Sequence, residues 1–443
     1  SAGVQVLAGL SNGAVSSGFG ISNQGSISGV QYGIQFLSSS SLTGGVTNTG
    51  VISSAGVGIK LSSATVIGGI TNSAGASIVG SAGQGIVIDA YSNLDRISNN
   101  GGYISGIANA GYINSATSLL IAGGTVTGSI NNSGSIVGSY YGAVIRDGSS
   151  VSGGIINSGL ISGGSLISVS GLVINNSTVD SGLNNSGSVA GKAAAIAMQS
   201  SSLLGGLTNS GSIQGNTAGL RFANSSITGG VSNTGLISGG AIGISVISGA
   251  HIVGGINNLA GATISSTNSN NGIQVGANSV VDGIVNSGYI TSIANFGTIA
   301  GDQGIQVLST GSFSAQGGIN NSGLIAGFAG NAITVTGSTP VTVNNLAAGS
   351  IVGAISGNAN VTNSGLFALQ TPSTVGGLVL AGSHLNAHIS GSYTQTNTGT
   401  LQIGVTGTGG SGATAGNFST LTVDGAATFT GNTGINVNIS GAT

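Results

Sequence analysis

A short phrase recurs fifteen times along this 443-residue chain: an Asn followed within a few residues by Gly and then by an apolar residue. Eleven of the fourteen intervals between successive copies span roughly 23–28 residues, and such a period indicates stacked repeats rather than one globular core. We therefore expect function on the long surface and at the two ends. The copies start at Asn23, Asn48, Asn72, Asn109, Asn132, Asn157, Asn185, Asn209, Asn233, Asn258, Asn286, Asn295, Asn321, Asn345 and Asn363.

The repeat has the pattern of β-strands. A clear copy runs over residues 226–239 and 243–246, and holds three short apolar pieces separated by Gly-Gly, by Asn-Thr-Gly or by another Gly. Within a piece, apolar and small polar residues alternate, which is the two-residue period of a strand. Gly and Asn are too dense for helix and supply the turns, and Ile and Val replace the leucines of a leucine-rich repeat. The pattern predicts three strands and three corners per rung of a right-handed parallel β-helix.

Stacking of the rungs supplies the stability of such a fold. About 14 rungs are predicted from the repeat, and at a strand spacing of about 4.8 Å they form a rod on the order of 70 Å long. Each inward aliphatic side chain contributes roughly 1.5–3 kcal/mol by burial. The inward positions expected in the clear copy are Ile227, Val231, Ile237, Ile244 and Val246.

The recurring Asn residues are interpreted as structural. Stacked at one corner of the solenoid, they would form a ladder that satisfies backbone groups left unpaired by the turn. The members assigned to this ladder are Asn48, Asn132, Asn157, Asn185, Asn209, Asn233 and Asn321.

The regular spacing of the Asn-Gly repeat ends near the C-terminus. Residues 1–370 are predicted to form the parallel β-helix, with a repeat length of roughly 24 residues. Residues 371–443 are predicted to form a β-rich C-terminal section. Alternation there is strict, but longer Gly/Ser loops such as residues 407–416 join the strands.

The sequence of the C-terminal section resembles the end of bacterial autotransporter passenger domains, where a similar stretch precedes the outer-membrane barrel. The residues that carry the resemblance are Tyr393-Thr394-Gln395, Gly399-Thr400-Leu401 and the alternating run from Leu421 through Val423 and Gly425 to Ala427. The resemblance implies a right-handed β-helix whose last part helps it fold after secretion. It also implies that the protein is extracellular or lies on a bacterial cell surface.

Composition excludes several classes of partner. Near neutral pH the permanently charged side chains are those of five Lys or Arg and seven Asp. The chain therefore has no basic patch that could bind nucleic acid or attach it electrostatically to a membrane. No run of eighteen apolar residues occurs, so we expect no direct membrane insertion by this chain. Cysteine is absent, which excludes disulfides and thiol chemistry.

Catalytic residues are sparse, and we expect neither an enzyme nor a cofactor. By repeat register the seven Asp fall on different rungs and at different positions within the rung. Asp89 and Asp95, with Arg96, lie close together in the one interval that is much longer than the repeat, which predicts a candidate binding loop. A solvated loop with an ion pair is the alternative, and Arg146 and Asp147 are interpreted as a turn pair. The Asp residues are Asp89, Asp95, Asp147, Asp180, Asp282, Asp302 and Asp424.

The histidines do not predict a metal site. His384 and His388 are four residues apart, which on a strand places them on one face but roughly 13 Å apart, too far to chelate one ion. His251 is remote in sequence, and no Ser-His-Asp arrangement or calcium-binding nonapeptide repeat is present.

One outward column of side chains is a candidate binding surface. It occupies the middle of the Gly-Ile-x-Val strand, and a flat polar column of this kind could bind extended glycans or a neighbouring rod. A merely solvated face is the alternative interpretation. The column contains Gln35, Lys60, Val87, Arg221, Ser245, Gln274, Gln306 and Thr334.

The two ends are the candidate assembly sites. No charged, helical or Pro-rich cap precedes Val4 and Val6, and the strand with Ile435, Val437 and Ile439 has no visible cover. We therefore predict a non-enzymatic structural protein that stacks end to end with copies of itself into a surface or matrix fibre with an adhesive role. The alternatives are a monomeric adhesin for surface glycans or host molecules, and a polysaccharide-degrading enzyme in which two Asp converge with Arg or Lys in one groove.

Overall fold

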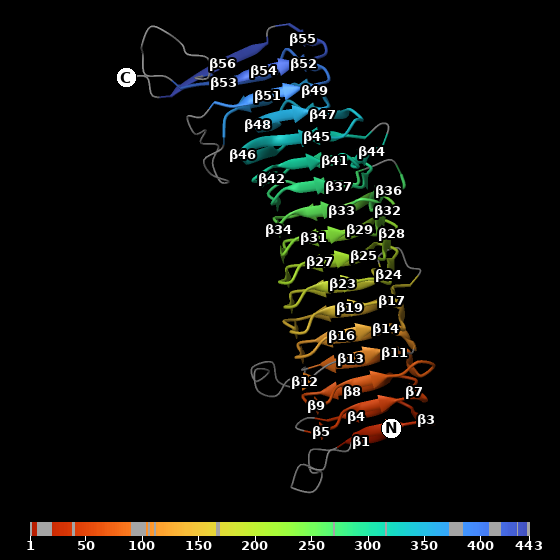
Figure 1. The fold of residues 1–443 in the computed structure, drawn as a ribbon. Coiled ribbons are helices and arrows are strands. Elements are labelled where there is room, and N and C mark those ends of the chain that lie inside the picture. Colours follow the sequence, from red (N-terminus) through yellow and green to blue (C-terminus); the bar gives the residue numbers. More distant parts are fainter. Residues whose placement is uncertain are drawn as a thin grey trace. The chain divides into compact units, whose positions relative to one another are not determined.

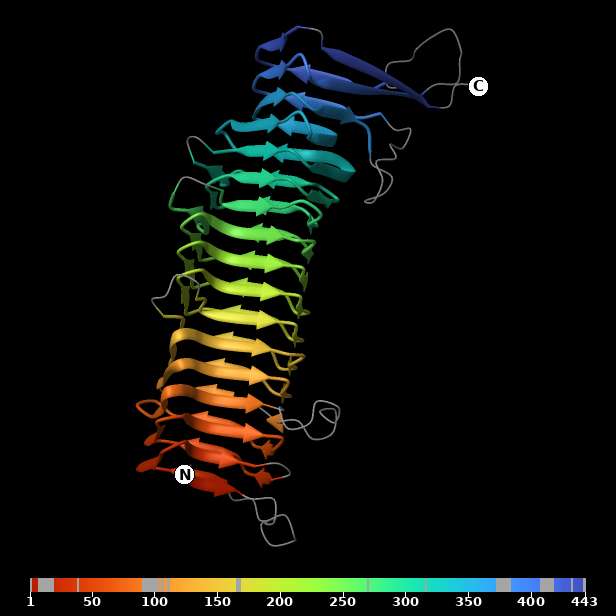
Figure 2. The same cartoon turned by 180° about the vertical axis from the view of Figure 1, so that it is seen from behind.

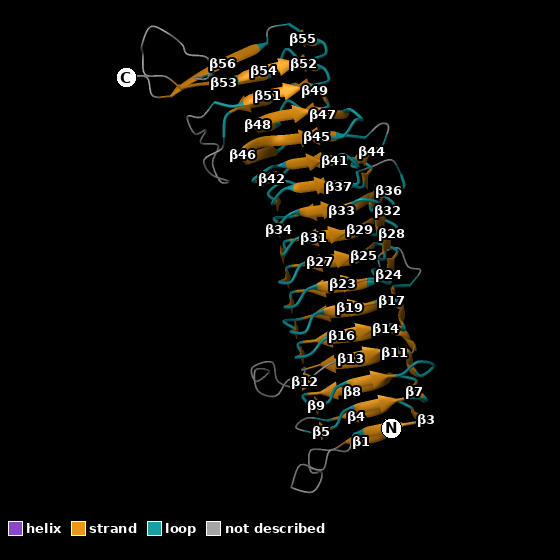
Figure 3. Ribbon diagram, viewed as in Figure 1, coloured by secondary structure: helices purple, strands orange, loops and turns teal. Residues whose placement is uncertain are grey.

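The chain forms a parallel β-solenoid of about 12 regular rungs, slightly fewer than the 14 predicted. A computed structural model describes residues 2–6, 20–37, 40–89, 103–104, 107–109, 112–164, 169–268, 271–314, 317–371, 384–406, 418–431 and 433–440. All regular structure in these residues is β-strand, and none is helix (Figures 1 and 3). The chain divides into two compact units, Ser1–Gly229 and Gly230–Thr443, which are described in turn.

A regular rung contains four short strand segments rather than the three predicted. In unit 1 one rung consists of Leu207–Asn209, Ser212–Gly215, Ala218–Ala223 and Ser226–Thr228. We name the four stacks of equivalent segments columns A, B, C and D in that order. In the sequence, the segments of columns D and A form one apolar piece, but in the structure a glycine corner separates them. In an early rung Gly44 and Gly45 take φ values of 109° and 74°, which favour glycine and end the strand.

In unit 1 the strands of each column pair in parallel with their counterparts in the next rung, seen from behind in Figure 2. Column A comprises β2 (Ile21–Asn23), β6 (Val46–Asn48), β10 (Ile70–Asn72), β13 (Ile107–Asn109), β16 (Ile130–Asn132), β19 (Ile155–Asn157), β23 (Leu183–Asn185) and β27 (Leu207–Asn209). Column B comprises β3 (Ser26–Gly29), β7 (Val51–Ser54), β20 (Leu160–Ser162), β24 (Ser188–Gly191) and β28 (Ser212–Gly215). Column C comprises β1 (Ala2–Val6), β4 (Tyr32–Phe36), β8 (Val57–Ser62), β21 (Leu172–Asn175), β25 (Ala194–Gln199) and β29 (Ala218–Ala223). Three longer strands run through columns B and C: β11 (Ser77–Asp89), β14 (Tyr112–Ala122) and β17 (Ser135–Arg146). Column D comprises β5 (Ser41–Thr43), β9 (Thr65–Ile67), β12 (Tyr103–Ile104), β15 (Thr125–Val126), β18 (Ser150–Val151), β22 (Thr178–Val179), β26 (Ser202–Leu203) and β30 (Ser226–Thr228).

Unit 2 repeats the four columns and then loses column B. Column A comprises β31 (Val231–Asn233), β35 (Ile256–Asn258), β39 (Ile284–Asn286), β43 (Ile305–Val307), β51 (Asn386–Ile389) and β54 (Thr420–Val423). Column B comprises β32 (Leu236–Gly239), β36 (Thr263–Ser266), β40 (Tyr289–Ile290) and β44 (Ser312–Phe313). Column C comprises β33 (Ile242–Ile247), β37 (Ile273–Val275), β41 (Ile293–Asn295), β45 (Ile319–Asn321), β47 (Val341–Asn345), β49 (Ala359–Asn363), β52 (Tyr393–Gln395) and β55 (Ala427–Phe429). Column D comprises β34 (His251–Val253), β38 (Val280–Val281), β42 (Thr298–Gly301), β50 (Leu366–Leu369), β53 (Thr400–Thr406) and β56 (Gly434–Ser440). Two strands run through columns D and A: β46 (Leu324–Val335) and β48 (Ser350–Gly357).

The core is a stack of inward aliphatic side chains. Each residue lies over a residue of similar type in the next rung, as Leu183 lies over Leu207, because the rungs pair in register. The five inward positions predicted from the sequence are confirmed, with exposed fractions of 0–2% for each of them. The strands after Thr371 continue this stack, since β52 pairs with β49 through Tyr393 and Val361.

The repeating Asn residues form buried ladders. Asn157 Nδ2 donates to Asn185 Oδ1 at 2.7 Å, and Asn185 Nδ2 in turn donates to Asn209 Oδ1 at 2.8 Å. Several of these amides also donate to main-chain carbonyls of their own corner and of the next rung; for Asn185 these are the carbonyls of Gly187 and Ser212, at 3.2 and 3.3 Å. At such corners the ladder therefore satisfies main-chain carbonyls as well as the side-chain amides themselves.

The Asn residues do not all stack at one corner, as predicted, but at two. In unit 2, Asn258 pairs with Asn286 in column A, and the next residue in that column is Val307. A second ladder starts in column C, where Asn295 follows Val275 and pairs with Asn321. The short interval between the Asn286 and Asn295 copies is thus a step from one corner to another within one rung, not a rung of its own.

Removal of one ladder member should destabilise the chain. Asn185→Ala leaves Asn157 Nδ2 without its side-chain acceptor and Asn209 Oδ1 without its side-chain donor, both within the core. We expect the free energy of unfolding to fall by about 2–3 kcal/mol, as measured by urea denaturation followed by circular dichroism. Asn184→Ala, on the exposed side of the same strand, is the matched control and should change it by no more than about 0.5 kcal/mol. Equal effects of the two substitutions would contradict a ladder role.

Aromatic side chains stack in the last rungs of unit 2. The Tyr393 ring lies 6.2 Å from that of Phe367 and 6.0 Å from that of Phe429. Tyr393 is fully buried and its hydroxyl donates to Gln395 Oε1. This burial raises the pKa of Tyr393 well above its ordinary value of 10.0.

The raised pKa of Tyr393 predicts a loss of stability in alkali. Above pH 10 an unfolded chain releases the phenol proton while the folded chain retains it, so the free energy of unfolding should fall as the pH rises from 10. Urea denaturation at pH 8 and at pH 11 measures this, and Tyr393→Phe should make the fall smaller. A phenol that titrates near pH 10 in the folded chain, by its absorbance, would contradict the burial.

Candidate functional site

The predicted binding loop is only partly described. Asp89 ends β11, where its carboxylate lies 3.3 Å from Lys60 Nζ. Lys60 Nζ also lies 5.7 Å from the centre of the Tyr32 ring. Asp95 and Arg96 lie outside the described residues, so the loop they belong to stays a prediction.

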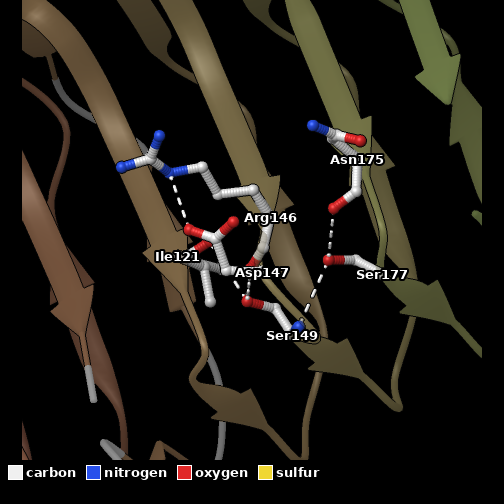
Figure 4. Close-up of polar contacts among 6 residues, drawn as sticks. All are labelled: Ile121, Arg146, Asp147, Ser149, Asn175 and Ser177. Atoms are coloured by element: carbon white, nitrogen blue, oxygen red, sulfur yellow. Dashed lines mark hydrogen bonds and ion pairs between the residues drawn. The ribbon is translucent and has the colours of Figure 1, made fainter. Parts of the chain in front are cut away.

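Arg146 and Asp147 lie at the corner between columns C and D of unit 1 (Figure 4). Arg146 Nε is 3.2 Å from Asp147 Oδ2, and both side chains are half-exposed. Asp147 has a φ of 61°, as a tight turn requires. Beneath them Ser149 Oγ donates to the Ile121 carbonyl at 3.2 Å. These contacts have the form of the turn pair interpreted from the sequence.

The predicted outward polar column divides between two columns of the solenoid. In unit 1, Gln35, Lys60 and Val87 stack in column C, and Val87 is only 4% exposed. In unit 2, Ser245 and Gln274 still stack in column C, whereas Gln306 and Thr334 stack in column A. The single continuous column was wrong because the sequence phrase changes corners after Asn286.

A pocket of about 370 Å³ lies on the outer face of column A in unit 2, across β35, β39 and β43. We call it the column A pocket. Its side chains come from the outward middle positions of these strands and from the corners between columns D and A. They include Asn257, Asp282, Val285, Asp302, Gln303 and Gln306.

The charged groups of this pocket lie at successive D–A corners. Asp282 Oδ1 is 2.7 Å from His251 Nε2, and its Oδ2 accepts from the Gly254 amide at 3.4 Å. These contacts fix the Asp282 carboxylate against β34. Asp302 occupies the next corner and is exposed. The pocket therefore presents one carboxylate that is held in place and one that is open.

The amide side chains of the pocket offer both donors and acceptors. Gln303 Oε1 accepts from Thr334 Oγ1 at 3.0 Å, which orients that amide. Asn257 Oδ1 is shielded from solvent and has no hydrogen-bond partner. Such an atom is uncommon in folded proteins, where shielded acceptors are nearly always paired.

The convergence of Asp282 and Asp302 was missed in the sequence. Counting from the nearest Asn copy places the two residues at different positions in the rung, because the copies at Asn286 and Asn295 belong to different columns. The signal available was the unusually short interval between those two copies, which marks the change of corner. Among the described residues no group of three or more His, Cys, Asp or Glu side chains is placed to hold a metal ion.

Two further findings concern the predicted histidine His388 and the absence of a membrane-spanning helix in the described residues. His388 Nε2 lies 2.9 Å and 3.0 Å from the carboxylate oxygens of Asp424, at an exposed position of β51 and the end of β54. The described part of the chain contains no apolar helix of membrane-spanning length.

The His251–Asp282 pair should contribute little to stability. Both side chains are more than one-third exposed, so solvent screens their attraction. We expect Asp282→Asn to lower the free energy of unfolding by less than about 1 kcal/mol in urea denaturation. A loss as large as that expected for a ladder Asn would instead make the pair part of the structural framework.

No protein-family model matches this chain, and neither does any curated protein or any solved structure. The function proposed below therefore rests on the sequence and on the geometry of the chain itself.

Proposed function

We propose that this chain is a non-enzymatic extracellular structural protein whose copies associate end to end into a fibre or matrix with an adhesive surface. The observation that carries the proposal is the exposure of inner apolar side chains in β55 and β56, the final strands that the structure describes in unit 2. Ile435 is 58% exposed, Val437 52% and Phe429 49%.

Two of these side chains continue an apolar column of the solenoid, whereas Phe429 stacks on the buried Gln395. Ile435 and Val437 of β56 pair in register with Leu401 and Ile403 of β53. Leu401, one rung earlier, is only 4% exposed. A further rung would therefore bury the apolar side chains of the last one, and each such side chain contributes roughly 1.5–3 kcal/mol when fully buried.

The same end presents free strand edges. Among the described residues β54, β55 and β56 each pair with a strand of the preceding rung and with none beyond. In unit 1, β1 contains the predicted assembly residues Val4 and Val6, and among the described residues it pairs with β4 and with no other strand. Unpaired edges are templates for strand addition. β1 and β55 both hold the column C position of their rungs, so a second copy offers a matching edge.

A low density of charge supports self-association. Only 3% of the residues are charged, and β1, β54, β55 and β56 contain none of the Lys or Glu side chains that normally keep strand edges apart. The solenoid is a head-to-tail structure, and a contact between its two different ends grows a filament rather than a closed ring.

The extracellular location is supported by the resemblance to autotransporter passengers. The segments that carry it lie in β52, β53, β54 and β55 and in the corners beside these strands of unit 2. An uncharged surface of Ser, Thr, Asn and Gly on a cysteine-free chain fits a secreted solenoid.

A polysaccharide-degrading enzyme has less support. The column A pocket, which holds two Asp, lies in unit 2, where residues 230–443 contain no Lys or Arg.

End-to-end assembly is tested by electron microscopy of the purified chain over a hundredfold range of concentration. The native chain should form filaments of uniform width that lengthen with concentration. Ile435→Asp/Val437→Asp places two charges in the proposed contact and should abolish them. Asn436→Asp, on the same strand, is the matched control for added charge and should still assemble. Circular dichroism establishes that each variant is folded.

Two outcomes would overturn the assembly proposal. Discrete particles of the native chain at every concentration would exclude end-to-end growth. Filaments that persist in the doubly charged variant would show that the contact lies elsewhere on the surface.

A further inference from the structure

We propose that the column A pocket binds a short, non-acidic saccharide. The inference is independent of end-to-end assembly, because the pocket lies on the lateral face of β35, β39 and β43. Its volume of about 370 Å³ is at the lower end of the range of ligand pockets, roughly 300–1,000 Å³. A ligand that fits is a small molecule or a short stretch of a polymer.

The charge of the pocket excludes anionic ligands. Its lining includes Asp282 and Asp302 but neither Lys nor Arg. All five basic residues of the chain that carry a permanent charge lie before residue 230, so none is available elsewhere in unit 2 to balance the two carboxylates. A uronate, a sulfated sugar or a phosphate would be repelled at this surface.

The hydrogen-bonding groups of the pocket fit hydroxyl groups. The Asp302 carboxylate forms no hydrogen bond or ion pair with other described residues, and Asp282 Oδ2 has only a long contact to the Gly254 amide. Carboxylates accept strong, charge-assisted hydrogen bonds from hydroxyls. The free acceptor capacity of these two side chains thus calls for a ligand with several donors.

The neighbouring amides require a ligand that also accepts. Gln306 has no side-chain partner among the described residues, and its amide offers two N–H donors. Asn257 Oδ1 is likewise unpaired, so this amide can turn toward a ligand without breaking a hydrogen bond of that oxygen. A sugar hydroxyl donates and accepts at once, whereas an ammonium group only donates and would leave the Gln306 N–H groups unpaired.

The spacing of the solenoid arranges these groups in a row. Asn257, Val285 and Gln306 occupy the same outward position of three successive rungs, and pair in register. Successive rungs are separated by about 4.8 Å. Val285 lies in the middle of the row and provides an apolar contact for the C–H face of a sugar ring. The ligand is therefore expected to lie along the stack.

Binding is tested by calorimetric titration of the whole chain at fixed ionic strength. The probes are neutral gluco-, galacto- and manno-oligosaccharides, amino-sugar oligomers and oligouronates. We expect heat of binding with a neutral or amino-sugar oligomer and none with the oligouronates. Asp302→Asn and Gln306→Ala should each weaken that binding about tenfold or more, because each removes a hydrogen-bonding partner.

The matched control is Asp180→Asn. Asp180 holds the corresponding D–A corner in unit 1, where its amide donates to the Val151 carbonyl as the Asp282 amide donates to that of Ile252. Its substitution removes the same charge outside the pocket and should leave the affinity unchanged. The Ile435→Asp/Val437→Asp variant should also bind normally, so failure of assembly and failure of binding are distinguished.

Three outcomes would overturn the saccharide proposal. The first is the absence of binding to every neutral and amino-sugar probe. The second is binding that Asp302→Asn and Gln306→Ala leave unchanged, which would place it elsewhere. The third is preferential binding of the oligouronates, or of a lysine-rich peptide without any saccharide, which would contradict the charge or the hydrogen-bonding argument.

Discussion

In-register stacking of equivalent residues is the constraint on which the rest of this structure depends. Each rung covers the apolar side chains and strand edges of the next, at a separation of about 4.8 Å. A side chain can therefore recur at a corner only if it is satisfied by its own copy one rung away. Asn meets this requirement, because its amide donates to the oxygen of the next Asn and accepts from the previous one, as Asn48 does with Asn72 and Asn23. A hydrophobic residue meets the same requirement by packing on its copy. A charged residue does not, because it would face a like charge.

The same constraint accounts for the scarcity of charge. A Lys or Asp repeated at one position of every rung would face its own charge at each step, so charged residues appear singly or in pairs, and some of these pairs link neighbouring rungs. Lys60 with Asp89 and His251 with Asp282 are such pairs. A surface built in this way is neutral and hydroxyl-rich over most of its length. Isolated carboxylates such as Asp302 therefore differ from the rest of this surface. A ligand with several hydrogen-bond donors has few other charged acceptors available in unit 2.

The sequence was sufficient for the fold class and for the inner residues but not for the division into columns. Alternation and the Asn-Gly corners predicted parallel stacked strands, and positions such as Ile237 and Val246 are buried as expected. The split of one predicted strand at Gly-Gly was not predicted, since a pair of glycines is compatible with a bulge as well as with a corner. The change of ladder after Asn286 was not predicted either. A repeat phrase specifies the local conformation of a corner, whereas the stacking partner of that corner depends on the lengths of the other three segments.

The column A pocket is a consequence of that change of ladder. In column A, Ile256 pairs with Ile284 and Ile284 with Ile305, but the second step covers a shorter stretch of sequence than the first. The short rung contains both Asn286, the last of one ladder, and Asn295, the first of the other. Its shorter corners place Asp302 on the D–A corner that directly follows the corner of Asp282, and both residues line the pocket. A perfectly regular repeat would present the same uniform face on every rung. The irregular rung allows different side chains to converge. At such a rung, a solenoid of this kind can acquire a binding site without an inserted loop.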